Sequence, residues 1–283
     1  MIPRKKLTAL GLCLTIFVSC ARGPREPKNG AKISGSHASL SDEREAEMGR
    51  QIHQSIVSTF RVYTEPRLVE YVRKIGESVA KSAERKNLPY QFTILYDDRI
   101  YATDAPGGFV YITTGFLNFL ENEAELAGVL AQEIAQLQYR DPRFSPSQKV
   151  LGAASQAGAV VGPFFGPIGA LGAVGLVLLS TMTLGKQVSP KKRIQAADRR
   201  ALRYLVEADQ DPQGYLDFLQ RLLNGDRMWT PYSYDYLTSR PLTQERYQRV
   251  VAEFGKLPLQ EKALTVNREL YREMTKGVRE IYR

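Results

Sequence analysis

The chain is poor in cysteine and histidine, the residue types that bind transition metals most often alongside carboxylates. Its 283 residues include two cysteines and two histidines. Cys13 lies in a segment that we expect to be removed, so Cys20 would be the one thiol of the mature chain. A single thiol excludes an intrachain disulfide and a metal site built from cysteines. Of the histidines, His37 falls in a polar stretch, and we expect His53 to be a helix residue satisfied by solvent or by a neighbour.

The sequence also lacks the marks of a nucleic-acid-binding protein. Its formal charge is +9, and removal of the basic residues 4–6 with the acid-free segment 1–19 leaves 9 − 3 = +6. Lysine and arginine are scattered among acids, and no recognition helix or motif of stacking aromatics is present. An anionic membrane surface is therefore favoured over nucleic acid as a partner. Apolar and charged fractions of 43% and 24% are those of a globular protein, which excludes general disorder.

The N-terminus is typical of an export signal. Residues 4–6 are basic, residues 7–18 form an apolar run too short to span a bilayer comfortably, and Ser19 precedes Cys20. The sequence FVSC at 17–20 resembles a bacterial lipobox, although Phe17 stands where leucine is usual. We predict a signal peptide over 1–19 and a lipid on Cys20. An ordinary cleaved signal and an uncleaved anchor are the alternatives.

Composition divides the remaining chain into three parts. Residues 20–40 are rich in proline, glycine and serine, which predicts a lipidated flexible tether. Residues 41–258 carry the helical and strand patterns of a folded domain, and residues 259–283 predict a C-terminal amphipathic helix. Core packing is the default interpretation of its apolar stripe, with binding of a partner as the alternative. That stripe comprises Leu264, Leu270, Met274, Val278 and Tyr282.

Within the domain, residues 41–63 and 68–79 have helical spacing, and residues 90–95 and 108–113 have strand character. Asn122 and Glu125 are spaced as a capping box, which predicts that 122–139 form one helix beneath a small sheet. The fold class is then α+β and mainly helical. The Gly- and Ala-rich apolar segment 150–185 has three interpretations: two Gly-packed helices, a hairpin in the membrane interface, or a true span.

Four short sequences, in this order, carry a resemblance to a known family. They are APGGFVYITTG at 105–115, EAELAGVLA at 123–131, AD at 197–198 and LTSRP at 237–241. Together they resemble the HtpX-like and CAAX-prenyl-protease-like zinc metallopeptidases, especially their periplasmic BepA-like branch. The resemblance implies a zincin-like (gluzincin) domain and, for the family, a zinc cofactor and metalloendopeptidase activity.

The positions that would bind zinc have changed. The family's His-Glu-x-x-His reads QEIAQ at 132–136, and the position four before Asp198, where the family has glutamate, is Ile194. We refer to Gln132, Gln136 and Ile194 as the ligand positions. Amides are poor zinc ligands and isoleucine offers no donor. Glu133 keeps the general-base position alone, so we expect no metal cofactor and an inactive enzyme, a pseudoprotease.

Two further residues follow from the resemblance. Asp198 stands where the family binds a metal-ligating histidine from the second shell; here it could cap a helix or accept a hydrogen bond from the Gln132 amide. Arg240 replaces a histidine of the loop over the metal. We expect a cation to neutralise Glu133, supplied by Arg240 or by Arg193, unless Glu133 is solvated in an open cleft.

The function predicted is that of a binding module. Active relatives lay the substrate on an edge strand, and main-chain pairing needs no metal. The residues predicted to form that peptide-binding edge strand are Gly108, Phe109, Val110, Tyr111, Ile112 and Thr113. Expected partners are the membrane, through the lipid, and envelope proteins, unfolded peptides or an active family member, in assembly or quality control. Ala21 after Cys20 favours the outer membrane. The alternatives are an active metalloendopeptidase with a non-standard or partner-supplied metal site, and a structural lipoprotein without a ligand.

Overall fold

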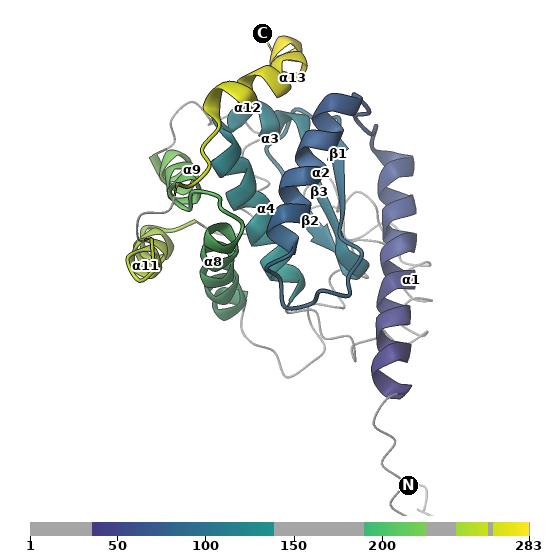
Figure 1. Ribbon diagram of the computed structural model, residues 1–283. Helices are drawn as coiled ribbons and strands as arrows, with labels where there is room; N and C mark the ends of the chain where they lie inside the picture. Colours follow the sequence, from purple (N-terminus) through teal and green to yellow (C-terminus); the bar gives the residue numbers. More distant parts are fainter. Residues whose placement is uncertain (1–35, 139–189, 225–241, 260–262, 283) are drawn as a thin grey trace, which may run out of the picture. The chain divides into compact units, whose positions relative to one another are not determined.

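The computed structural model of the chain describes residues 36–138, 190–224, 242–259 and 263–282 (Figure 1). Several sequence predictions lie outside these ranges: the signal peptide over 1–19, lipidation of Cys20, the tether up to residue 35, the nature of segment 150–185, and the role of Arg240. In the described ranges, no helix is both long and apolar enough to cross a membrane.

A small mixed sheet lies at the centre of the domain. It consists of β1 (Gln91–Leu95), β2 (Ala102–Ala105) and β3 (Phe109–Thr113), in the order β1-β3-β2. β3 is parallel to β1 and antiparallel to β2. The β2–β3 hairpin turns through η1 (Pro106–Gly108), where Gly107 and Gly108 have φ of 78° and 94°, a region open to glycine at little cost.

The prediction that 108–113 form an edge strand is wrong, because β3 is paired on both sides. The strand itself is confirmed, with its first residue one position later. β2 was not recognised because its sequence ATDA has little of the β-branched or aromatic character of strands. β1 is covered on its outer side, where the amide of Tyr63 donates to Ile94 and that of Tyr96 to Arg61.

Alternation along β3 gives the sheet two apolar faces. Phe109 and Tyr111 point to one face, where they pack with Ile52 and Ile56 of α1 (Ser36–Thr59). Val110 and Ile112 belong to the main core on the other face, together with α2 (Pro66–Ala80) and α4 (Glu123–Leu137). The sheet thus lies between α1 and the α2/α4 layer (Figure 1). The α+β fold class is confirmed.

Helix α1 begins at Ser36, five residues before the predicted start, so the last part of the predicted tether is helical. No proline or glycine follows Gly35 until Gly49, and Ala38 and Leu40 favour a helix. α1 is held tightly on the hairpin turn: a Cβ at Gly49 would lie 2.1 Å from the carbonyl oxygen of Pro106.

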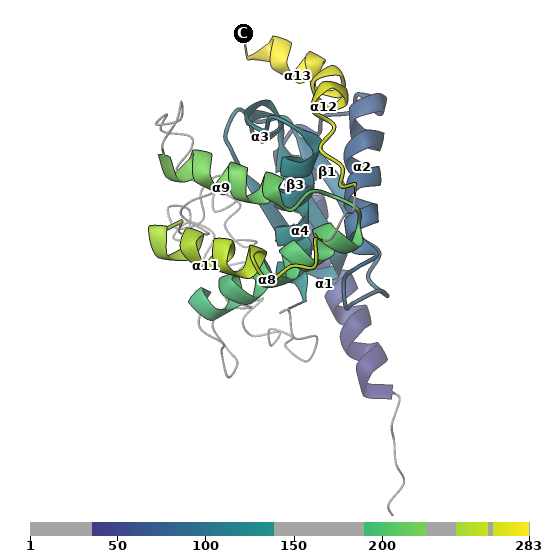
Figure 2. The same ribbon diagram turned by 60° about the vertical axis from the view of Figure 1, so that its left-hand side comes forward.

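Helix α4 matches the prediction for 122–139 closely, and all its residues are buried. The Asn122 side chain caps it by accepting from the amide of Glu125. Beyond α4 lie α8 (Pro190–Glu207), α9 (Gln213–Asn224) and α11 (Gln244–Phe254) (Figure 2). Gly128 allows α9 to approach closely, since a Cβ there would lie 2.8 Å from the Cβ of Tyr215.

The C-terminal residues form two short helices, α12 (Arg268–Met274) and α13 (Lys276–Ile281), where one amphipathic helix was predicted. Val278 is buried, and Met274 and Tyr282 are partly buried against the core, which confirms core packing for these residues of the stripe. Leu270 is 38% exposed. The break falls at Thr275, whose hydroxyl donates to the carbonyl of Tyr271.

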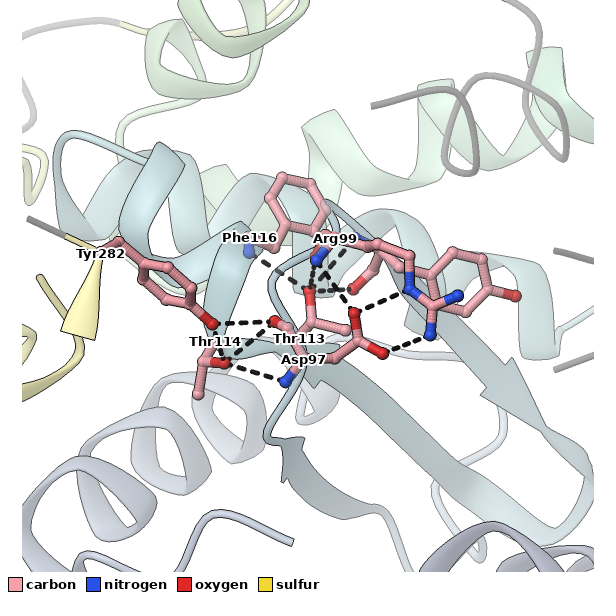
Figure 3. A network of polar contacts seen from close by, with 7 residues as sticks. Asp97, Arg99, Thr113, Thr114, Phe116 and Tyr282 are labelled. Atoms are coloured by element: carbon pink, nitrogen blue, oxygen red, sulfur yellow. Dashed lines mark hydrogen bonds and ion pairs between the residues drawn. The ribbon is translucent and has the colours of Figure 1, made fainter. Parts of the chain in front are cut away.

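The end of the chain docks on the loop after β1 (Figure 3). The Tyr282 hydroxyl lies 2.7 Å from the Thr114 hydroxyl and donates to the carbonyl of Asp97 at 3.1 Å. Thr114 opens α3 (Thr114–Phe119), and the carboxylate of Asp97 binds the Arg99 guanidinium. The C-terminal helices are therefore an integral part of the domain that supports the start of α4.

Candidate functional site

Helix α4 places Gln132, Glu133 and Gln136 within about one turn, as their spacing requires. Gln132 and Glu133 have no exposed surface, and Gln136 is also buried. Neither amide atom of Gln132 has a hydrogen-bond partner among the described residues. Leaving a buried polar group unpaired costs about 1–3 kcal/mol. A fully buried Glu133 also shows that its placement in an open, solvated cleft is wrong.

Helix α8 packs on α4 more extensively than any other helix does. It carries Ile194 in its second turn and Asp198 one turn further on. This confirms that the helix with Asp198 lies against the helix with the glutamines. Contact of the Ile194 side chain with Gln132 and Gln136 stays a prediction, as does pairing of Glu133 with Arg193 or Arg240.

Asp198 is bound by an arginine and a tyrosine from two other helices. Arg246 of α11 donates through Nε to Oδ2 at 3.0 Å and through Nη2 to Oδ1 at 2.9 Å. The Tyr215 hydroxyl of α9 donates to Oδ1 at 2.9 Å and accepts from Arg246 at 3.2 Å. All three residues are buried. A bidentate pair of this kind joins α8, α9 and α11 behind α4.

The prediction that Asp198 accepts a hydrogen bond from the Gln132 amide is therefore wrong. A carboxylate gains more from a guanidinium than from a neutral amide, because the bond is charge-assisted on both sides. The amide nitrogen of Gln132 has no partner in the described part of the chain.

Arg246 was missed by sequence reasoning, although a signal was present. It lies one turn before Val250, on the buried face of helix α11, and it is 2% exposed. An arginine at an apolar position of a helical repeat indicates a buried acidic partner, because an unpaired charge there would be too costly. The sequence does not identify the partner.

His53 is confirmed as a histidine satisfied by a neighbour. Its ring stacks on Phe109, with centroids 4.8 Å apart, and Nδ1 lies 3.1 Å from the hydroxyl of Tyr111. Desolvation lowers the pKa of His53 below its usual value. It lies on α1, on the sheet face opposite the main core that contains α4, so it does not belong to the site around Gln132.

The residues at this site do not fit zinc. The ion prefers imidazole, thiolate and carboxylate ligands, whereas the ligand positions provide two amides and a hydrocarbon. The described residues include no cluster of three or more histidine, cysteine, aspartate or glutamate side chains that could hold a metal. Arg246 provides a positive charge next to this site, and it neutralises Asp198.

Helix α4, buried between a small mixed sheet and a layer of helices and carrying Glu133 beside Gln132, has the arrangement of a metallopeptidase-like α+β domain. The profile of Peptidase family M48 matches residues 66–253. The chain belongs to this family. The matched range includes β1 to β3, α4, α8 and Arg246, so the whole candidate site lies inside it.

Two curated relatives show the same relationship. The chain is 28% identical over 214 residues to the beta-barrel assembly-enhancing protease of Yersinia pestis. It is 25% identical over 216 residues to the protein of the same name in Escherichia coli strain K12. Each match covers 74% of this chain and 43% of the relative. The chain thus spans less than half the length of these relatives.

Proposed function

We propose that this chain is a non-catalytic member of family M48 that binds extended or unfolded polypeptides in the bacterial envelope, in assembly or quality control of envelope proteins. The observation that carries the proposal is the state of the ligand positions. The fold of the family is retained, while Gln132 and Gln136 stand where the resemblance places zinc-binding histidines. Without an ion to activate water, Glu133 alone supplies only a small part of the catalysis required.

The packing around the site supports a structural role for Asp198 and its partners. Asp198 is held by Arg246 and Tyr215, and this network fastens three helices to each other. These contacts hold the helices together through side chains of the chain itself. A binding surface on the scaffold can then persist without chemistry.

The envelope location rests on two arguments. The relatives with the same domain are named as beta-barrel assembly-enhancing proteases of bacteria. The sequence of residues 1–20 has the features of a lipoprotein signal, which would anchor the chain through Cys20 and, with Ala21 following, in the outer membrane. Globomycin treatment of expressing cells, which blocks processing of lipoprotein signals, should cause an unprocessed precursor to accumulate.

Metal analysis and casein assays on the purified protein test the function. We expect far less than one zinc per chain, no digestion of casein, and binding of labelled casein that is equal in wild type and Glu133→Gln. Stoichiometric metal together with digestion that Glu133→Gln abolishes would establish the alternative, an active metalloendopeptidase. Absence of both digestion and binding would leave a structural lipoprotein.

A further inference from the structure

The contact between α1 and the sheet contains a histidine with a defined hydrogen-bond partner. His53 is half-buried between Ile52 and Ile56, two core residues of α1. It stacks on Phe109 at an interplanar angle of 19°, and its Nδ1 faces the Tyr111 hydroxyl. The polar contacts of this interface are the imidazole–phenol pair and, about two turns earlier on α1, Glu45, which binds the Arg85 guanidinium and accepts from the amide of Gly107.

The direction of that hydrogen bond depends on the charge of the imidazole. With a neutral ring, Nδ1 can accept the hydrogen of the Tyr111 hydroxyl. Protonation makes both ring nitrogens donors, so the hydroxyl has to accept and its own hydrogen needs another acceptor. Tyr111 has no exposed surface, and the described residues offer its hydroxyl no other hydrogen-bond partner. The protonated state therefore leaves a buried donor unsatisfied.

The described part of the sheet face that meets α1 offers no negative charge that could stabilise a protonated His53. In register with Tyr111 are Thr93 on β1 and Thr103 on β2, neither of which titrates. Asp104 is in register with Val110, which belongs to the opposite face. A carboxylate that would stabilise an imidazolium is missing from the described part of this face.

On helix α1, the buried carboxylate of Glu45 lies about two turns before His53 and is bound by the Arg85 guanidinium. Glu47 and Arg50, the nearest charged residues on the N-terminal side of His53, are exposed and bond to each other at 2.6 Å. Stacking on Phe109 favours a cation to a small extent. Burial opposes it, and desolvation lowers the pKa of His53 below its usual value.

We propose that the His53–Tyr111 contact is a pH-dependent latch that holds α1 on the sheet when His53 is neutral and loosens α1 when His53 is protonated. The open state binds the proton more readily, because there the imidazole is hydrated. Docking of α1 is therefore most stable above pH 6.5 and weakens as the pH falls through that value towards the folded-state pKa. Helix α1 would gain freedom in mildly acidic surroundings, and the apolar face of Phe109 and Tyr111 would become accessible.

Hydrogen exchange measured by mass spectrometry on the full chain tests the latch. Peptides covering 45–58 should exchange several-fold faster at pH 5.5 than at pH 7.5 after correction for intrinsic rates, while peptides from α4 change little. His53→Phe keeps an aromatic ring for stacking but cannot titrate, so its α1 peptides should show no such response. Tyr111→Phe removes the hydroxyl whose hydrogen would lack an acceptor, so it should reduce the difference in exchange between the two pH values.

Equal protection of α1 at both pH values in the wild type would overturn the proposal. So would an undiminished pH response in His53→Phe, since the sensor would then be another group. Should that variant fail to fold, a proton NMR titration of the wild type decides, because the chain has only two histidines. A pKa of His53 at or above 6.5 would refute the latch. These readouts are independent of peptide binding and of metal content.

Discussion

The buried pair of Arg246 and Asp198 makes a quantitative prediction about stability. Their side chains are 2% and 4% exposed, and Arg246 donates to both carboxylate oxygens. Arg246→Met keeps much of the volume but leaves Asp198 buried with one neutral donor, Tyr215. Removing one partner of a buried ion pair costs about 3–5 kcal/mol, because the other charge stays desolvated.

Urea titration followed by circular dichroism measures this loss. With a slope of about 2–3 kcal/mol/M, the midpoint of Arg246→Met should fall by about 1–2.5 M. Arg249→Met on the same helix is the matched control. Arg249 pairs with Glu245, which is 64% exposed, so the change should cost no more than about 0.5 kcal/mol.

A second substitution separates the lost charge from lost packing. Asp198→Asn in the Arg246→Met background removes the orphaned charge and should recover part of the stability. If Arg246→Met unfolds at the same urea concentration as Arg249→Met, the buried pair contributes no more than an exposed one and the reasoning fails.

Three further changes have defined outcomes. Gly128→Ala should lower the free energy of unfolding by about 1–3 kcal/mol, because its Cβ would meet Tyr215 at 2.8 Å; Gly255→Ala, with nothing nearer than 3.7 Å, should not lower it. Although desolvation opposes them, hydrogen bonds from Tyr204 and Arg203 lower the pKa of Glu84 to about 2. This stabilisation is present above pH about 4.3 and is lost as the pH falls towards 2. Glu84→Gln should therefore reduce the loss of unfolding free energy over this pH range by up to about 1 kcal/mol, a figure discounted because the Glu84 side chain is 44% exposed. The double variant Gln132→His with Gln136→His should bind zinc weakly in isothermal calorimetry, and adding Ile194→Glu should strengthen that binding. Tight zinc binding by the double variant would reveal another ligand.

Local signals in the sequence predicted most of the elements that build the site. Asn122 with Glu125 marks the start of α4, and the helical spacing of residues 68–79 marks α2. Each signal acts within a few residues, through a cap or one face of a helix, so one sequence suffices to interpret it. The ligand positions could also be located from one sequence, because Gln132 and Gln136, like Ile194 and Asp198, are separated by one helical turn.

Pairings between distant segments could not be predicted in this way. The central place of β3 depends on β2, a strand of low propensity that is stabilised by its neighbours. Likewise, the tail divides at Thr275 because α13 must bring Tyr282 to Thr114, a contact between residues far apart in the sequence. Tertiary contacts of this kind override the helical period that the tail shows.

The clearest such pairing is the one at Asp198, and it bears on whether a metal site could be rebuilt. The resemblance implies that the family's histidine partner of Asp198 is gone, and in this chain Asp198 is bound on both oxygens by Arg246. A carboxylate has about four acceptor positions, and three hydrogen bonds to Arg246 and Tyr215 occupy part of that capacity. A histidine introduced at Gln132 could therefore still donate to Asp198 without displacing Arg246. If the chain binds no zinc, as we propose, the side chains at the ligand positions account for it, and not the ion pair behind them.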